Sequence, residues 1–422
     1  MVEDIFIQPF ELRVYKKINF TGIEILVKLV VDIFSFMKKF YFLFPLLVLL
    51  VIFSCTNNKK TKEGPVEPAQ ELTTTTTLKY AKRFTINRRA TYKKITVNEP
   101  WPGSTDTLTY IITGDKDILK KYKNDNSIIL VRQPVRKMVC FSTTHLPFLE
   151  LIETEDRLCG FPTTSYIYSK KIRDMVREGR VKDLGPSNEI NFESLLALDP
   201  DLVFAFSMGN ELSMVRKIQL SGISLVMNSD YLENHPLGRA EWIKFMAAFF
   251  DKDQAADSIF NQIESSYLET RTKMSELQTC PTVFTGVVYG DTWFMPGGNH
   301  YGTVFFKDAG GDYLWSDNNS ESILQLSFES VYEKAGKADY WIGTATYNSL
   351  NEIEQADIRY RDFRAFDKGN IFNYSAKVNQ DGGNAYFEMG YARPDIILKD
   401  LAKILHPGEM EDHQFYFYKK LY

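Results

Sequence analysis

The chain has 422 residues, of which 44% are hydrophobic and 25% are charged, a composition typical of globular proteins with two or three domains. The formal net charge is only -4, and the Lys and Arg residues do not cluster into a basic stripe. These features argue against a nucleic-acid backbone as the partner.

Near the N-terminus, residues 37–55 read MKKFYFLFPLLVLLVIFSC. A basic start, an apolar run too short to span a bilayer comfortably and a small residue before Cys55 predict a secretory signal. The VIFSC ending resembles a bacterial lipobox, in which the cysteine is acylated and becomes the first residue of the mature protein. Ordinary signal-peptidase cleavage and an uncleaved anchor helix are the alternatives. Residues 1–36 precede a complete signal, so we interpret them as a gene-start artefact, with translation beginning at Met37.

Residues 56–77 are polar, rich in Pro and Thr, and without apolar periodicity. Such a segment buries too little apolar surface to order itself, so we expect a flexible tether. Cys140, Cys159 and Cys280 follow in or beside apolar runs. We interpret them as small buried hydrophobic residues, in preference to a disulfide framework or a metal site.

Beyond the tether, FTINRRATYKKITVNEPW and DTLTYIIT alternate between polar and apolar residues, which predicts antiparallel strands before the first lobe. Short apolar runs then alternate with helical segments, a pattern that predicts βαβ units on parallel sheets. We expect an α/β protein with an N-terminal lobe at 78–237, linker helices at 238–279 and a C-terminal lobe at 280–422.

The linker shows apolar residues three and four positions apart, a spacing typical of helices. The sequence DKD at 251–253 interrupts the spacing once, so we expect a short helix followed by a long one. A stiff connection between the lobes follows from this prediction. The apolar positions are Trp242, Met246, Phe249, Ala256, Ile259, Ile263, Tyr267 and Met274.

The tripeptide Phe-Glu-Ser occurs twice, at 192–194 and at 328–330. Asn191 and Ser327 precede these tripeptides and are good N-cap residues, and an early carboxylate, Glu193 or Glu329, favours the positive end of a helix. Helix capping explains each glutamate separately. It does not explain why two distant segments repeat each other, which suggests two similar lobes with equivalent helix starts.

Taken in order, residues 137–409 resemble the helical-backbone substrate-binding proteins of ABC importers for iron-siderophores, haem and cobalamin. The stretches that carry the resemblance are RKMVCFSTTHLPFLELIETEDRLCGF, NFESLLALDPDLVFA, GISLVM, the linker, GGNHYGTVFFKDAGGDYLWSD, SFESVYEKAGKADYWIG and YARPDIILKDLAKILHP. In STTHLPFLE, a Pro and an aromatic residue stand where many members carry Thr-Glu-Ile, and the N-terminal strands are an addition.

The resemblance implies two Rossmann-like lobes with parallel sheets joined by a single long helix, the class III periplasmic-binding-protein fold, with small hinge motion. It implies a monomer without an intrinsic cofactor that binds a metal chelate and delivers it to an ABC permease and its ATPase. It also implies that Glu193 and Glu329 dock onto permease arginines. Together with the lipobox, it places the protein in the periplasm, anchored to a membrane.

In open α/β sheets, ligands bind at loops that follow the carboxyl ends of the strands. The loops expected there are rich in aromatic side chains, which suit a flat macrocycle or catecholate. Each of these rings could instead pack inside its lobe, and Arg393 could pair with a nearby carboxylate rather than an anionic ligand. The candidate ligand residues are His145, Tyr166, Tyr168, Trp293, Tyr301, Tyr347, Tyr386 and Arg393.

Three histidines fall in candidate loops, His145, His235 and His300, but the chain has only 5 His and these have no tight spacing. We therefore favour surface or supporting roles over metal ligation. No G-x-S-x-G, H-E-x-x-H, P-loop or G-x-G-x-x-G motif is present, which argues against an enzyme. An extracytoplasmic enzyme acting on a metal chelate, or a carrier without its own permease, is the alternative.

Overall fold

The computed structural model describes residues 73–187, 189–209 and 212–422. The predicted gene-start segment, the signal with Cys55 and most of the tether lie outside these residues. The tether was expected to continue to residue 77, but the structure corrects this boundary. Thr74–Thr75 form strand β1 and pair antiparallel with Arg88 and Asn87. These β-branched residues favour extended backbone and add a short strand to the edge of β2.

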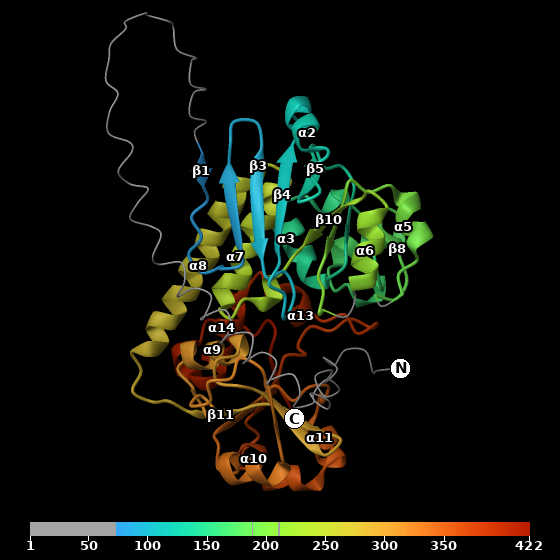
Figure 1. Ribbon diagram of the computed structural model, residues 1–422. Coiled ribbons are helices and arrows are strands. Elements are labelled where there is room, and N and C mark those ends of the chain that lie inside the picture. Colours follow the sequence, from blue (N-terminus) through green and yellow to red (C-terminus); the bar gives the residue numbers. More distant parts are fainter. Residues whose placement is uncertain (1–72, 188, 210–211) are drawn as a thin grey trace, which may run out of the picture. The chain divides into compact units, whose positions relative to one another are not determined.

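The N-terminal extension forms a sheet in the spatial order β1-β2-β3-β4-β5 (Figure 1). Its strands after β1 are antiparallel up to β4, as predicted, and β5 adds to β4 in parallel. The alternation places Ile95 and Val97 of β3 in the core. The elements are β2 (Phe84–Arg88), β3 (Lys93–Asn98), β4 (Thr107–Thr113), α2 (Lys116–Tyr122) and β5 (Ile128–Arg132).

The N-terminal lobe contains a parallel sheet in the order β10-β9-β6-β7-β8, which confirms the βαβ prediction. Its strands are β6 (Met138–Cys140), β7 (Leu158–Phe161), β8 (Lys182–Asp183), β9 (Leu202–Ala205) and β10 (Ser224–Met227). Its helices are α3 (Leu146–Leu151), α4 (Lys170–Arg177), α5 (Phe192–Leu198) and α6 (Leu212–Leu220).

The linker consists of a short helix α7 (Pro236–Ala248) and a long helix α8 (Asp253–Ser275), as the sequence predicts. The break falls at Asp251, whose φ of 56° lies in the left-handed region. Every residue of α7 is buried, so this helix lies inside the protein. The apolar spacing of the sequence therefore identified the helix but understated how much of its circumference is covered.

Residues 79–83, just before β2, are held by three buried carboxylates on the linker helices or just before them. Glu241 of α7 accepts hydrogen bonds from the backbone N–H groups of residues 79, 80 and 81 at 2.8–3.0 Å. Glu233 accepts from those of residues 82 and 83 at 2.9 and 3.1 Å. Glu264 of α8 accepts from the Tyr80 hydroxyl at 2.8 Å. The N-terminal extension thus braces both linker helices.

The C-terminal lobe contains a second sheet in the order β14-β11-β16-β17-β18, parallel except for β18, and a smaller antiparallel sheet in the order β12-β13-β15. Its strands are β11 (Thr282–Phe284), β12 (Val287–Tyr289), β13 (Thr292–Pro296), β14 (Asp312–Tyr313), β15 (Ile323–Leu326), β16 (Tyr340–Ile342), β17 (Ile371–Asn373) and β18 (Lys419–Lys420). Its helices are α9 (Tyr301–Asp308), α10 (Phe328–Ala335), α11 (Leu350–Ala356), α12 (Arg364–Asp367), α13 (Ala385–Met389) and α14 (Pro394–Leu405).

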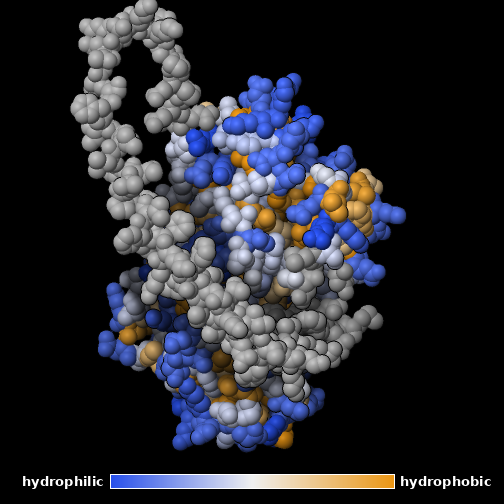
Figure 2. Space-filling model, in the orientation of Figure 1, coloured by the Kyte–Doolittle hydropathy of each residue, from blue (hydrophilic) through white to orange (hydrophobic). Residues whose placement is uncertain are grey.

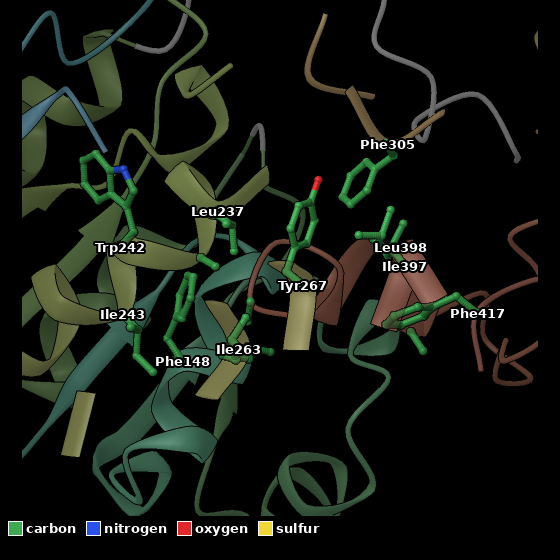
Figure 3. Packing of buried hydrophobic residues seen from close by; sticks show 14 of the residues in the cluster. Phe148, Leu237, Trp242, Ile243, Ile263, Tyr267, Phe305, Ile397, Leu398 and Phe417 are labelled. Atoms are coloured by element: carbon green, nitrogen blue, oxygen red, sulfur yellow. The ribbon is translucent and has the colours of Figure 1, made fainter. Parts of the chain in front are cut away.

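One hydrophobic core cluster runs through the linker into both lobes. Figure 3 shows Phe148 of the N-terminal lobe, Tyr267 of α8, and Phe305 and Leu398 of the C-terminal lobe among its side chains. Close packing of this kind resists shear, because separating such surfaces exposes apolar area to water. The structure therefore joins the lobes through packed helices, as the predicted stiff connection requires.

Candidate functional site

Loops at the carboxyl ends of the parallel strands lie where open α/β sheets carry their ligand sites. In the N-terminal lobe, β6 leads into a short 3-10 turn at Thr143–His145, for which the Ser142 hydroxyl accepts a hydrogen bond from the Thr144 N–H. The strand β10 leads into residues 228–233, which reach the start of α7. This second loop and the first turn of α7 carry two buried charged residues, Asp230 and Arg239, that the sequence did not identify.

Arg239, on the first turn of α7, lies at the centre of a cluster formed with the 228–233 loop and with tyrosines of the C-terminal lobe. Its side chain is buried, and its guanidinium carbon lies 3.3 Å from the ring centre of Tyr301 and 4.3 Å from that of Tyr391, both in the C-terminal lobe. Its Nε donates to the Glu233 carbonyl at 2.9 Å and its Nη2 to the Tyr231 carbonyl at 2.6 Å. A cation held against two aromatic faces gains electrostatic stabilisation in a site with little water.

Asp230 lies close enough to Arg239 to be influenced by its charge. Burial raises the pKa of the Asp230 carboxyl to about 7, and the positive charge of Arg239 opposes this shift. Within the part of the chain that the structure describes, Asp230 Oδ2 and Arg239 Nη1 have no hydrogen-bond partner. The pair can therefore offer one acceptor and one donor to a polar group of a ligand.

A group of tyrosines surrounds this point in the C-terminal lobe. Ring centres are 5.8 Å apart for Tyr301 and Tyr391, 4.7 Å for Tyr374 and Tyr386, and 5.7 Å for Tyr386 and Tyr418. Burial raises the pKa of Tyr374 to about 12 and raises the pKa values of Tyr386, Tyr391 and Tyr418 as well. These phenols are neutral at physiological pH and present flat rings with hydroxyl groups. We call these five residues the tyrosine wall.

The sequence predicted Tyr301 and Tyr386, and the structure places both in the tyrosine wall. It missed Arg239, Asp230, Tyr374, Tyr391 and Tyr418. Arg239 and Asp230 flank a helix start in an ordinary polar sequence, so no local pattern marks them. The repeated Tyr in YFEMGYAR was the available signal for Tyr391.

Other predicted ligand residues lie apart from the wall. Trp293 is fully buried in its lobe, with its ring centre 5.8 Å from that of Trp341 and its Nε1 donating to the Thr285 carbonyl at 3.0 Å. Arg393 binds Asp395 through two 2.9 Å hydrogen bonds, which is the carboxylate pairing considered as its alternative. We leave both residues out of the proposed site.

Tyr166, Tyr168 and Tyr347 are the remaining predicted aromatic residues. Tyr166 is exposed, whereas Tyr168 and Tyr347 are half-buried in their loops. The backbone of Tyr168 contacts the C-terminal lobe, because its N–H donates to Glu388 Oε2 at 2.6 Å. The structure thus brings the 166–168 loop to the junction of the lobes.

His145 is fully buried at the end of its 3-10 turn, and α13 of the C-terminal lobe packs against this turn. Burial lowers the pKa of its imidazole to about 3, so the ring is neutral. Neither ring nitrogen has a hydrogen-bond partner in the described residues.

His235 and His300 both cap helices. Nδ1 of His235 accepts from the Leu237 N–H at the start of α7, and Nδ1 of His300 accepts from the Gly302 N–H at the start of α9, both at 3.1 Å. Burial lowers the pKa of His300 to about 4, and the charge of Arg239 adds to this effect. These contacts give the supporting roles that the sequence favoured for both residues.

The two predicted docking glutamates have exposed side chains on α5 and α10. Asn191 Oδ1 and Ser327 Oγ cap these helices by accepting from Ser194 and Ser330, as predicted. Beside Glu193, Leu196 is 43% exposed, and Figure 2 shows apolar side chains at the surface over α5. The two helix starts therefore present carboxylates to solvent, one in each lobe.

The described cysteines are free, and Cys140 is buried and Cys159 half-buried. Cys280 is exposed, which corrects the expectation that all three are buried, because it lies between the linker and β11 rather than in a strand. Among the described residues, no group of three His, Cys, Asp or Glu could hold a metal ion. No helix in the same residues is long and apolar enough to cross a membrane.

Three comparisons relate the chain to known proteins. Over 388 residues it is 27% identical to an uncharacterized lipoprotein of Methanocaldococcus jannaschii, covering 86% of this chain and 89% of that protein. The fold is similar to that of the periplasmic haem-binding protein RhuT from Roseiflexus sp. RS-1, with a TM-score of 0.53 and 16% identity over 65% of this chain and 99% of that one. It is also similar to that of the molybdate-binding protein MolA of Haemophilus influenzae, with a TM-score of 0.52 and 17% identity over 68% and 90% of the two chains.

These similarities agree with the architecture of two parallel-sheet lobes on linker helices, the class III periplasmic-binding-protein fold. The model of the family described as "Periplasmic binding protein" matches residues 138–377, more than half of the chain. The chain therefore belongs to the periplasmic binding protein family.

Proposed function

We propose that this protein is a lipid-anchored substrate-binding protein of an ABC importer, which captures a metal chelate outside the cytoplasm and delivers it to a permease. The ligand classes we propose are iron-siderophore, haem and cobalamin. The observation that carries the proposal is the tyrosine wall beside Arg239, at the junction of the two lobes.

The chemistry of this wall suits a large, flat and partly polar ligand. Aromatic rings give a wide contact area at a low cost in side-chain entropy, and their hydroxyl groups can hydrogen-bond to ligand edges. Arg239 Nη1 and Asp230 Oδ2 supply a donor and an acceptor for a polar substituent. Two proteins of similar fold are described as binding haem and molybdate, which supports a metal-containing ligand.

The anchoring part of the proposal rests on VIFSC at 51–55, and a relative of similar length is named a lipoprotein. Two or more acyl chains would hold the protein stably on a membrane. A mass measurement of the purified N-terminus tests this, because an unmodified start at residue 1 would contradict both the anchor and the translation start at Met37. The proposal that the protein docks on a permease rests on a separate observation, the exposed side chains of Glu193 and Glu329.

The ligand is tested by purifying the protein from its native host and recording its visible absorption spectrum, since all three classes absorb visible light. Purified protein is then titrated with haem, cyanocobalamin, a ferric catecholate, a ferric hydroxamate and molybdate. We expect Tyr301→Leu to weaken binding of the chelate about tenfold or more, because it removes a ring that also holds Arg239.

The control is Tyr422→Leu, which removes an exposed tyrosine at the C-terminus and should leave affinity unchanged. Binding of molybdate alone, or of none of these ligands, would contradict the chelate assignment. Chemical change of the bound ligand would instead support the enzymatic alternative.

A further inference from the structure

A carboxylate of the C-terminal lobe is hydrogen-bonded to the backbone of the N-terminal lobe. Glu388, on α13, is buried, and its Oε2 accepts from the Tyr168 N–H at 2.6 Å while its Oε1 accepts from the Ser169 N–H at 2.9 Å. Nearby, Asn379 Nδ2 donates to the Ile167 carbonyl at 2.8 Å. Residues 167–169 therefore receive polar contacts from two points of the other lobe.

The same helix packs against the loops that follow β6. The described contacts of α13 include the 3-10 turn at Thr143–His145 and the helix α3. Helix α13 also carries Tyr386 of the tyrosine wall. A residue that fixes α13 on the N-terminal lobe therefore also fixes part of the proposed ligand surface.

The charged and titratable groups around Glu388 come from each element packed against it. Glu150 of α3 accepts from the Ser169 hydroxyl at 2.8 Å, and its negative charge acts on Glu388. Arg173 of α4 acts in the opposite sense, and Glu388 in turn acts on Tyr416 of the C-terminal segment. His145 beneath α13 is neutral, because burial lowers its pKa to about 3.

We propose that Glu388 is a positioning residue that latches α13 onto residues 168–169, and that this latch makes closure of the ligand site depend on pH. The inference rests on the proposed function, because it concerns regulation of the same site. It concerns the contact between the lobes and is independent of which chelate is bound.

The physical reason is the different exposure of Glu388 in the latched and unlatched forms. Burial raises the pKa of the latched carboxyl to about 7, the hydrogen bonds from Tyr168 and Ser169 oppose this shift, and Glu150 adds to it. In the unlatched form the carboxyl contacts water, and its pKa returns toward the ordinary value for Glu, about 4.3.

The sign follows from proton linkage. The latched form binds its proton more tightly, so the latch is strongest below the unlatched pKa of about 4.3, weakens as the pH rises from there through 7, and levels off at higher pH. Between pH 6 and pH 8 the protonated fraction of the latched form falls, and the latching equilibrium should fall about tenfold. A protonated carboxyl still accepts one hydrogen bond through its carbonyl oxygen, so the contact persists at acidic pH.

The test measures hydrogen exchange of the Tyr168 and Ser169 amides in the purified full chain without ligand. Exchange rates are divided by those of an unfolded peptide of the same sequence at each pH, which removes the intrinsic effect of pH. We expect about tenfold greater protection at pH 6 than at pH 8. Equal protection at both values would overturn the proposal.

Two variants identify the titrating group. Glu388→Gln keeps the size of the side chain but cannot lose a proton, so the difference between pH 6 and pH 8 should disappear. Glu150→Gln removes the neighbouring charge and should keep the difference, shifted to lower pH. If Glu150→Gln abolishes the difference and Glu388→Gln does not, the assignment to Glu388 is overturned. Glu388→Asp, which shortens the side chain, should weaken protection at both pH values.

Because exchange is measured without ligand, the two proposals can fail separately. A protein that binds none of the chelates but shows the pH-dependent protection would contradict the proposed function and keep the latch. A protein that binds a chelate but shows equal amide protection at pH 6 and pH 8 would support the proposed function and contradict the latch.

Discussion

Glutamates at two regions of this protein perform opposite tasks. At residues 79–83, the buried side chains of Glu241 and Glu233 accept hydrogen bonds from consecutive backbone N–H groups. At the starts of α5 and α10, the side chains of Glu193 and Glu329 point into solvent. The same functional group is a structural anchor at one region and an available charge at the other.

Burial accounts for the difference. Removing a buried carboxylate leaves its donors without partners in a medium of low polarity, and each such donor costs about 1–3 kcal/mol. An exposed carboxylate near a helix start contributes only about 0.3–1 kcal/mol, because water already solvates it. We propose that a partner, rather than the fold, accounts for a carboxylate that adds little to stability but is repeated in two lobes.

The largest expected effect comes from breaking the buried region. Glu241→Ala should lower the free energy of unfolding by about 3–5 kcal/mol, since it leaves the N–H groups of residues 79–81 without their acceptor and removes a carboxylate that pairs with the buried Lys244 ammonium. Urea unfolding followed by circular dichroism measures this change.

Glu269→Ala is the matched control, because Glu269 is an exposed glutamate on the other linker helix and should change stability by less than about 0.5 kcal/mol. A loss below about 1 kcal/mol in Glu241→Ala would mean that the N-terminal extension is not fastened through this carboxylate.

The same contrast explains what sequence reasoning could find. The N-caps Asn191 and Ser327 were predicted because the side chain of an N-cap accepts a hydrogen bond from a backbone N–H only three residues later. The strands were predicted because apolar runs between turn signals are local features. Glu241 could not be recognised as an anchor, because its partners lie about 160 residues earlier in the chain.

In the candidate site too, local features were predictable and contacts between distant parts of the chain were not. Tyr301 and Tyr386 were predicted because the sequence assigned them to loops after strand ends, whereas Trp293 met the same criterion and is buried in the core. Whether an aromatic side chain faces a ligand or a neighbouring helix depends on tertiary packing that a single sequence does not encode locally. Arg239 was missed for this reason, since its aromatic contacts come from the other lobe.

The second prediction concerns the exposed region. Reversing both charges, with Glu193→Arg and Glu329→Arg, should nearly abolish uptake of the chelate by cells, because each carboxylate is proposed to meet a permease arginine. Chelate affinity of the purified protein should be unchanged, and stability should change by about 1 kcal/mol or less.

The control for net charge is the pair Glu269→Arg and Glu276→Arg, which makes the same change at exposed positions of α8 and its C-terminus. Normal uptake by the Glu193 and Glu329 double variant would return both residues to a capping role. Loss of chelate binding would mean that these helix starts belong to the ligand site.

The smallest expected effect distinguishes the two helix starts from each other. Glu329 forms an ion pair with Arg359 at 3.2 Å, and the Arg359 guanidinium also binds Asp357 and lies 4.0 Å from the ring centre of Phe328. Within the described residues, Glu193 forms no such pair. If the docking proposal holds, a permease arginine would have to displace Arg359 at α10, whereas no cation within the described part of the chain pairs with Glu193 at α5.

Because exposed ion pairs contribute little, the competition should be mild, and Arg359→Gln should strengthen docking to permease in membranes about threefold. In a Glu329→Gln background, the same substitution should have no further effect, since the carboxylate for which the two arginines compete is gone. Equal strengthening in both backgrounds would show that Arg359 acts through general electrostatics. Weaker docking in Arg359→Gln alone would show that Arg359 holds Glu329 in the orientation that the permease binds, which would make the two helix starts different in mechanism.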